Sequence, residues 1–202
     1  MKLYYFPGAC SIAPHIVARE AGIALELEKV DLGSKRTATG EDYLAVNPKG
    51  YVPALRLDDG SVLTEVSALV QYLADRAPGS GLIPPAGSME RYRVLEWIGY
   101  ISTEIHKGFG PLWNAKLAPE ARAAAVAALA HRLDLVEKSL ASQPFLTGER
   151  FTVADAYLFA VASWAPWVKL DMAPWPKVRD FVARVGARPK VQEALVAEGL
   201  VE

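Results

Sequence analysis

Cysteine is nearly absent from this sequence, because Cys10 is the only one among 202 residues. A single cysteine excludes an intramolecular disulfide, a paired-cysteine redox motif and a cysteine-rich zinc site. The three histidines, His15, His106 and His131, are too scattered along the chain to form a metal-binding motif. We therefore expect no bound metal, and Cys10 is either a buried core thiol or a lone reactive one.

The sequence also lacks an excess of either charge, since 22 Lys and Arg balance 23 Asp and Glu to a net charge of −1. Nucleic-acid-binding proteins usually carry a basic excess, so we expect no nucleic-acid partner. Long apolar runs are missing too. The uncharged stretch 157–168 is shorter than the ~20 residues of a membrane span, and the apolar run after Lys2 is too short for a signal peptide. We therefore expect a soluble cytoplasmic protein that does not bind a membrane.

Glycine and proline are concentrated in one segment, 78–87, where they supply six of ten residues. Neither a helix nor a strand ladder continues through such a segment. Before it the pattern alternates between element types, and after it the pattern is helical throughout. We therefore predict an α/β domain at 1–77, a linker at 78–87 and an all-helical domain at 88–202.

The first domain opens with a strand–helix–strand pattern, which predicts parallel strands and a right-handed crossover. Ser11 and Thr64 are the expected caps of the two helices. Asp58-Asp59-Gly60 is a hairpin turn signal between the last two strands. The predicted order is βαβ–ββα. The strands are expected at 2–6, 25–30, 52–57 and 61–63.

The second domain contains only helical patterns. Ser88 is expected to cap a helix that runs toward His106. Thr152 and Asp155 have the spacing of a capping box, and the apolar helix that follows them is expected to form the buried centre of the bundle. A further long helix carries an apolar stripe made of Leu129, Leu133, Val136 and Leu140.

Cys10 lies in the turn between the first predicted strand and the following helix. The carboxyl ends of strands are where α/β sheets bind ligands, and the amino end of a helix favours a thiolate over a thiol. The alternative is a small apolar filler, since free cysteine is often buried. Because the turn is rich in Pro, Gly and Ala, a ligand-facing thiol is favoured.

Val52-Pro53 opens the third predicted strand, and Glu65 begins the helix after the fourth. Proline in a strand is disfavoured unless it lies at an end, at an edge or after a cis bond. A cis bond would leave the backbone of Val52 free to pair with an extended, peptide-like ligand, although the local sequence favours a trans bond. Glu65 either complements the positive end of its helix or meets a ligand ammonium group.

Four separated segments occur in order and at fitting spacing along the whole chain. They are Tyr-Tyr-Phe-Pro-Gly-Ala-Cys-Ser at 4–11, Asn-Pro-Lys-Gly-Tyr-Val-Pro-Ala-Leu at 47–55, Leu-Thr-Glu at 63–65 and Thr-Val-Ala-Asp at 152–155. Together they resemble the motifs of bacterial cytosolic glutathione S-transferases, and the cysteine in the first segment points to the beta class.

This resemblance implies a thioredoxin-like first domain, an all-helical second domain and a homodimer, with glutathione as co-substrate. Cys10 would face the glutathione sulfur and form a mixed disulfide with it. Glu104 would reach across from the neighbouring subunit. The other residues implied in glutathione binding are Lys35, Tyr51, Val52, Pro53, Glu65, Val66, Thr103 and His106.

The same resemblance implies an enzyme that conjugates glutathione to apolar electrophiles, with Cys10 and His106 as its catalytic residues. Two other functions stay open: a glutathione-dependent thiol–disulfide oxidoreductase or dehalogenase, and a non-enzymatic glutathione- or ligand-binding protein. The electrophile would contact Phe109, Trp113 and Trp164 in the helical domain.

Two positions depart from the family pattern. Val66 stands where relatives often carry Ser or Gly, so a backbone donor survives there but a hydroxyl is missing. Gly99 stands where relatives present an amide side chain, and a glycine within a helix suggests a close approach of another helix.

Overall fold

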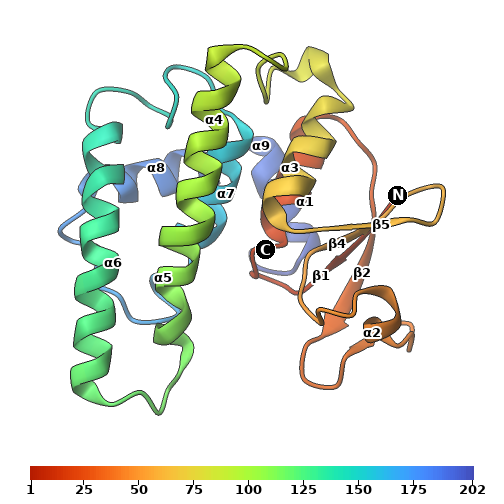
Figure 1. Cartoon of the computed structure of the whole chain (residues 1–202), viewed down its shortest axis with the longest axis horizontal. Helices are drawn as coiled ribbons and strands as arrows, with labels where there is room; N and C mark the ends of the chain where they lie inside the picture. The colour runs from red at the N-terminus through yellow and green to blue at the C-terminus, as the bar shows by residue number, and fades with distance from the viewer. The chain divides into compact units, whose positions relative to one another are not determined.

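The computed structural model describes residues 1–202, and its first part contains a five-stranded sheet (Figure 1). The spatial order is β3-β2-β1-β4-β5, with β1 parallel to β2 and antiparallel to β4. This arrangement confirms the predicted βαβ–ββα order and adds one short strand, β3. The strands are β1 (Lys2–Tyr5), β2 (Glu26–Asp31), β3 (Arg36–Thr37), β4 (Ala54–Arg56) and β5 (Val62–Thr64).

Helices cover both faces of this sheet (Figure 1). Successive residues of a strand point to opposite faces, so Leu3 and Tyr4 of β1 lie on opposite sides, and both are fully buried. Tyr4 packs in one apolar cluster with Tyr43 of the short helix α2 (Tyr43–Val46). On the side away from α2, α1 (Ile12–Glu20) packs against α3 (Val66–Asp75). The chain leaves β1, the central strand, directly into the loop that carries Cys10.

The chain forms two units, and the division after Ile83 falls inside the predicted linker. The segment 188–202, predicted as part of the helical domain, lies instead with the first unit. Its helix α9 (Pro189–Ala197) packs along α1, and Arg188 contacts Glu20 with N–O distances of 2.7 and 3.0 Å. The first unit comprises Met1–Ile83 and Arg188–Glu202, and the second Pro84–Ala187.

The second unit is entirely helical, and its central helix is α7. Every residue of α7 is buried, and the helix packs against α4 and α8, which confirms the predicted centre of the bundle. Its first turn has the predicted capping box of Thr152 and Asp155. The helices are α4 (Met89–Tyr100), α5 (Lys107–Phe109), α6 (Pro119–Leu140), α7 (Val153–Ala162) and α8 (Pro176–Gly186), with a π-helical segment η2 (Ile101–His106) between α4 and α5 and a short 3₁₀ turn η3 (Gly110–Trp113). Another 3₁₀ turn, η1 (Pro78–Ser80), lies in the first unit, before the division after Ile83.

Besides the capping box of α7, one predicted cap is confirmed and two are wrong. The hydroxyl of Ser88 accepts a hydrogen bond from the backbone N–H of Arg91 at 3.2 Å, as a helix cap should. Ser11 instead bonds back to the backbone N–H and C=O of Phe6, because its own backbone is already helical. Thr64 ends β5, and its hydroxyl accepts a hydrogen bond from Lys49 rather than from helix N–H groups.

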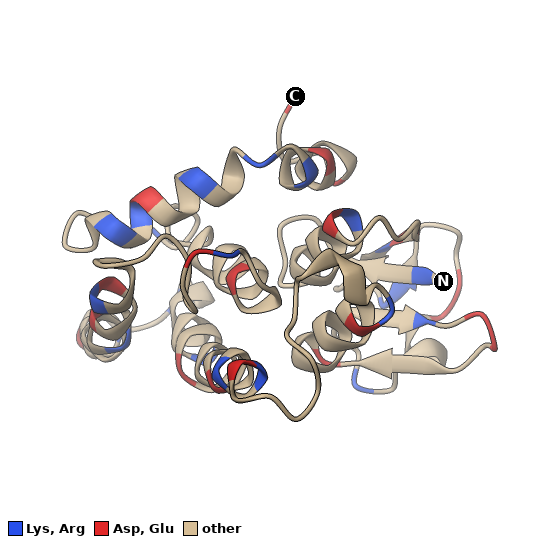
Figure 2. Cartoon of the chain, turned by 90° about the horizontal axis from the view of Figure 1, so that it is seen from above, with Lys and Arg blue, Asp and Glu red and all other residues tan.

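No helix combines the length and the apolar character needed to cross a membrane. Lys and Arg are intermingled with Asp and Glu over the helices of both units (Figure 2), in keeping with the nearly neutral net charge. The candidate site residues fall into two sets, one in the first unit, which contains the sheet, and one in the helical second unit.

Candidate functional site

Cys10 lies in the loop between β1 and α1, just before the first turn of α1. Its exposed fraction is 9%, and its Sγ donates a hydrogen bond to the backbone carbonyl of Val52, with an S–O distance of 3.5 Å. A carbonyl only accepts hydrogen bonds, so this contact holds Cys10 as a thiol. The amino end of α1 favours the anion. The structure thus places one nearly buried sulfur between the carbonyl of Val52 and the amino end of α1.

The peptide bond between Val52 and Pro53 is cis, although the local sequence alone favoured trans. Both residues are buried and directly precede β4. The cis bond that the sequence left as the alternative is therefore the one present. Val52 is therefore the backbone element that lies against the Cys10 sulfur.

The backbone of the segment before Val52 is fixed by hydrogen bonds from side-chain donors. The hydroxyl of Tyr43 and the amide of Asn47 both donate to the backbone carbonyl of Tyr51, at 2.6 and 2.7 Å. Burial raises the pKa of Tyr43, which keeps its hydroxyl a donor at neutral pH. The Nζ of Lys35 donates to the carbonyl of Gly50 at 2.9 Å. These bonds fix the backbone while the side chain of Tyr51 stays 73% exposed.

Glu65 stands immediately before α3 with a positive φ of 72°, a conformation that a non-glycine residue rarely adopts. Its carboxylate is exposed and pairs with the Nζ of Lys49 at 2.7 Å. The backbone N–H groups of Val66 and Ser67 open α3 and have no intrahelical acceptor. A carboxylate beside free helix N–H groups suits a ligand that carries an ammonium and a carboxylate on neighbouring atoms.

These groups of the first unit form one connected set. Cys10 contacts Val52, Lys35 contacts Gly50 beside Tyr51, and Lys49 joins the same segment to Glu65. The predicted residues of this unit therefore lie along the short segment 49–53 and the two helix starts that flank it. This connected set offers the carboxylate of Glu65 with the helix N–H donors of α3, the peptide backbone of 49–53 and the sulfur of Cys10.

The predicted residues of the second unit gather around His106. Its Nδ1 lies 2.8 Å from the hydroxyl of Tyr157, and its ring packs edge-on against Trp164 with centroids 5.0 Å apart. Trp164 also makes edge contacts with Phe109 and Trp113. Phe109 is fully buried, while Trp113 is 50% exposed. The result is an aromatic cluster with one half-buried imidazole.

Tyr157 was missed as a site residue by the sequence reasoning, which treated it only as part of an apolar helix. A buried tyrosine usually finds a hydrogen-bond partner. His106 lies 51 positions earlier in the sequence, so no local pattern identifies it as the partner of Tyr157. Thr103 donates to the carbonyl of Gly99 at 3.1 Å, one turn earlier. Thr103 and His106 lie in η2, and π-helical segments often occur at functional sites.

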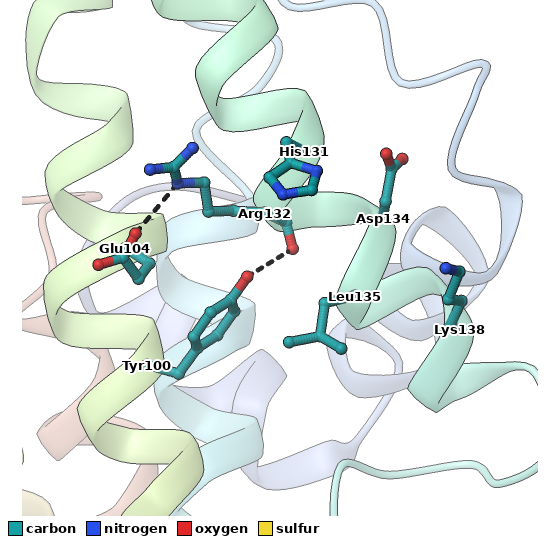
Figure 3. Close-up of a pocket in the computed structure, with 7 residues that line it drawn as sticks. All are labelled: Tyr100, Glu104, His131, Arg132, Asp134, Leu135 and Lys138. Carbon is teal, nitrogen blue, oxygen red and sulfur yellow. Dashed lines mark hydrogen bonds and ion pairs between the residues drawn. The ribbon is translucent and has the colours of Figure 1, made fainter.

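Glu104 lies apart from the aromatic cluster, at a cavity of about 490 Å³ between α4, η2 and α6 (Figure 3). Arg132 donates to its carboxylate at 3.0 Å, and Tyr100 donates to the backbone carbonyl of Arg132 at 3.0 Å.

Gly99 is exposed, and a Cβ there would meet nothing within 4 Å, so the expected close helix approach is absent. Such an approach occurs at Gly108, where a Cβ would lie 3.0 Å from Leu129 of α6.

No group of three or more His, Cys, Asp or Glu side chains is placed to hold a metal ion.

The chain matches the family model "Glutathione S-transferase, N-terminal domain" over residues 9–76 and "Glutathione S-transferase, C-terminal domain" over residues 100–189.

Relatives agree with these matches over the full length. Glutathione S-transferase GstA of Escherichia coli O157:H7 is 50% identical over 200 residues, covering 99% of this chain and 100% of the relative. The structure of a sphingomonad glutathione S-transferase complexed with glutathione has a TM-score of 0.95 at 45% identity, with 100% of each chain covered. A beta-class glutathione S-transferase from Sphingomonas chungbukensis has a TM-score of 0.95 at 44% identity and the same coverage. The chain therefore belongs to the bacterial beta class of the glutathione S-transferase family.

Proposed function

We propose that this protein is a glutathione transferase that conjugates glutathione to small apolar electrophiles. The observation that carries the proposal is the Cys10 sulfur held against the backbone of Val52 at the start of α1. Glutathione is a thiol on an extended peptide, with an ammonium and a carboxylate at its γ-glutamyl end. The connected set on the first unit offers a partner for each of these groups. The sphingomonad relative, of the same fold, is complexed with glutathione.

The pairing of groups follows from charge and geometry. Glu65 binds the γ-glutamyl ammonium, and the N–H of Val66 binds the carboxylate beside it. The backbone of Val52, next to the Cys10 sulfur, pairs with the cysteinyl residue. Lys35 and Tyr51 lie toward the glycyl end, where the ammonium of Lys35 attracts the terminal carboxylate. This orientation brings the glutathione sulfur to Cys10.

Glutathione must react as its thiolate, and holding that anion beside an electrophile is the main catalytic requirement. The amino end of α1 stabilises negative charge on a sulfur near Cys10. Phe109, Trp113 and Trp164 supply the apolar surface that an aromatic electrophile prefers. His106, held by Tyr157, is a candidate to donate a proton. Roles for Thr103, Glu104 and His106 in contacting glutathione stay predictions.

The proposal is tested by mixing the protein with glutathione and a chlorinated nitroaromatic and following the conjugate by absorbance. We expect turnover that saturates with glutathione, and calorimetric binding of glutathione in the absence of electrophile. Binding without turnover across several electrophiles would instead favour a ligand-binding protein. Absence of binding would contradict the proposal outright.

Replacing Glu65 by Gln should weaken glutathione binding about tenfold, since the amide loses the charge that pairs with the ligand ammonium. The measurement is calorimetric titration with glutathione. Glu26→Gln is a matched control, because Glu26 is also an exposed carboxylate in an ion pair, with Lys2 at 2.9 Å. Equal affinities of the two variants would remove Glu65 from the site.

A second activity is favoured by one observation, the placement of a cysteine sulfur that forms no disulfide at the proposed glutathione site. Cys10 would attack the glutathione sulfur of a glutathionylated substrate, R–S–S–G, forming a Cys10–glutathione disulfide and releasing the substrate thiol. A second glutathione would then attack that disulfide, which regenerates the Cys10 thiol and releases oxidised glutathione. This cycle needs no second cysteine in the chain.

The proposal also includes a cytoplasmic homodimer, as the family resemblance implies. Sedimentation should then give twice the 21.9 kDa mass of one chain.

A further inference from the structure

A carboxylate near the end of the chain is completely buried. The side chain of Glu198, one residue beyond α9, has an exposed fraction of 0%. Buried carboxylates are costly unless every oxygen finds a donor. The donors of Glu198 therefore indicate what the residue does.

Two donors from different elements meet this carboxylate. Oε1 lies 2.9 Å from Nδ1 of His15, which is itself only 1% exposed, in α1. Oε2 accepts the backbone N–H of Gly8 at 3.2 Å. Arg19 donates to the other ring nitrogen of His15 at 3.3 Å, which leaves Nδ1 as the hydrogen-bearing nitrogen that donates to Glu198.

Gly8 belongs to the loop that carries Cys10, two residues later. Its φ of 72° lies in the region that favours glycine, and a Cβ there would come within 3.4 Å of Leu200. Within the loop, the N–H of Ala9 donates to Phe6 at 3.0 Å. The loop is therefore closed on one side by its own turn and on the other by the C-terminal segment.

We propose that Glu198 is a positioning residue that holds the loop 7–10 and thereby sets the access to the Cys10 sulfur. It acts on the sulfur through Gly8 and contacts no reacting atom. The consequence for glutathione chemistry rests on the function proposed above, whereas the control of thiol access does not.

Only a carboxylate fits this position. Both neighbours are donors, so Glu198 must present two acceptors. The amide of glutamine has the same shape but one acceptor, so it would set an NH₂ group against either His15 or Gly8. Glu198→Gln therefore disturbs the loop contact without opening a cavity.

A purely structural role would consist of attaching the C-terminal segment to α1. That role has a matched control, because Glu20 joins the same segment through Arg188 and does not contact the loop. Glu20→Gln makes the same chemical change at the same pair of helices. Thermal stability therefore does not separate the two roles, whereas the rate at which the Cys10 thiol reacts does.

The experiment measures the rate at which N-ethylmaleimide alkylates Cys10, the only thiol, by intact mass. We expect Glu198→Gln to react about tenfold faster than wild type, the effect of losing one buried hydrogen bond. Glu20→Gln should react at the wild-type rate. Equal rates in wild type and Glu198→Gln, or equal acceleration in both variants, would overturn the proposal.

A second measurement uses the wild-type protein and does not depend on any variant folding. Hydrogen exchange should find the Gly8 amide protected, as expected for a donor to a buried acceptor. Exchange of that amide at the rate of an open loop would contradict the proposal. Glutathione affinity, measured in parallel, separates failure of this proposal from failure of the glutathione function, because alkylation requires no glutathione.

Discussion

Replacing Asp155 by alanine should lower the free energy of unfolding by about 3 kcal/mol, the size expected when buried donors lose a charged acceptor. Asp155 is fully buried in the first turn of α7. Its carboxylate accepts from the N–H of Thr152, the hydroxyl of Thr152 and the N–H of Leu146, each at 2.8 Å. It therefore ties the start of the central helix to the loop before it. Urea unfolding followed by circular dichroism measures the change.

Asp171→Ala is the control, since this exposed aspartate accepts only one backbone N–H, that of Ala173 at 2.9 Å. It should change the free energy of unfolding by less than about 0.5 kcal/mol. A similar small effect for Asp155→Ala would contradict the assigned role.

The carboxyl group of Asp155 should also make the free energy of unfolding depend on pH. Burial raises the pKa of Asp155 to about 6, above the value near 4 of an unfolded chain. Between these values the folded state binds a proton that the unfolded state has released, so stability from this group falls as pH rises through that window. Asp155→Asn should lack this dependence, which separates Asp155 from the other acids.

Replacing Cys10 by serine should abolish covalent attachment of glutathione to the protein. Wild-type protein treated with oxidised glutathione should exchange its thiol hydrogen for one glutathionyl group and release one reduced glutathione. The chain has no other cysteine, so serine at this position leaves no sulfur to react. Intact mass measures the adduct, and wild type with reduced glutathione under anaerobic conditions is the unreacted control.

The activities of the same variant separate the two candidate reactions. If Cys10→Ser still conjugates the nitroaromatic but no longer releases the thiol of a glutathionylated substrate, the sulfur serves disulfide exchange. If conjugation is lost as well, the sulfur serves both reactions. An unmodified mass for treated wild type would rule out the mixed disulfide.

Much of the fold could be predicted because its signals are local. Strand alternation, the Asp58-Asp59-Gly60 turn and the spacing of Thr152 and Asp155 each depend on neighbours a few residues apart. The caps assigned to Ser11 and Thr64 were wrong because both hydroxyls found partners outside their helices, in the backbone of Phe6 and the ammonium of Lys49. The N–H groups of a helix and a tertiary partner compete for the same hydroxyl oxygen, and local sequence does not determine which of the two contacts forms.

The candidate site was predicted where motifs are contiguous and missed where partners are distant. Cys10, Val52 and Glu65 lie in recognisable segments, and the structure joins them through residues 49–53. The link from Glu198 to Gly8 spans 190 residues, so no local pattern could reveal it. Residues that support a site are often spread along the chain in this way, because tertiary packing brings residues into contact regardless of their distance in the sequence.

The docking of α9 on α1 also has a consequence for biosynthesis. Residues 188–202 leave the ribosome after the whole helical unit, yet they complete the unit that contains β1. The helical unit, Pro84–Ala187, is continuous and is fully synthesised before them. On the ribosome the nascent sheet unit must therefore wait for its own C-terminal helix, while the intervening unit already has every residue it needs to fold.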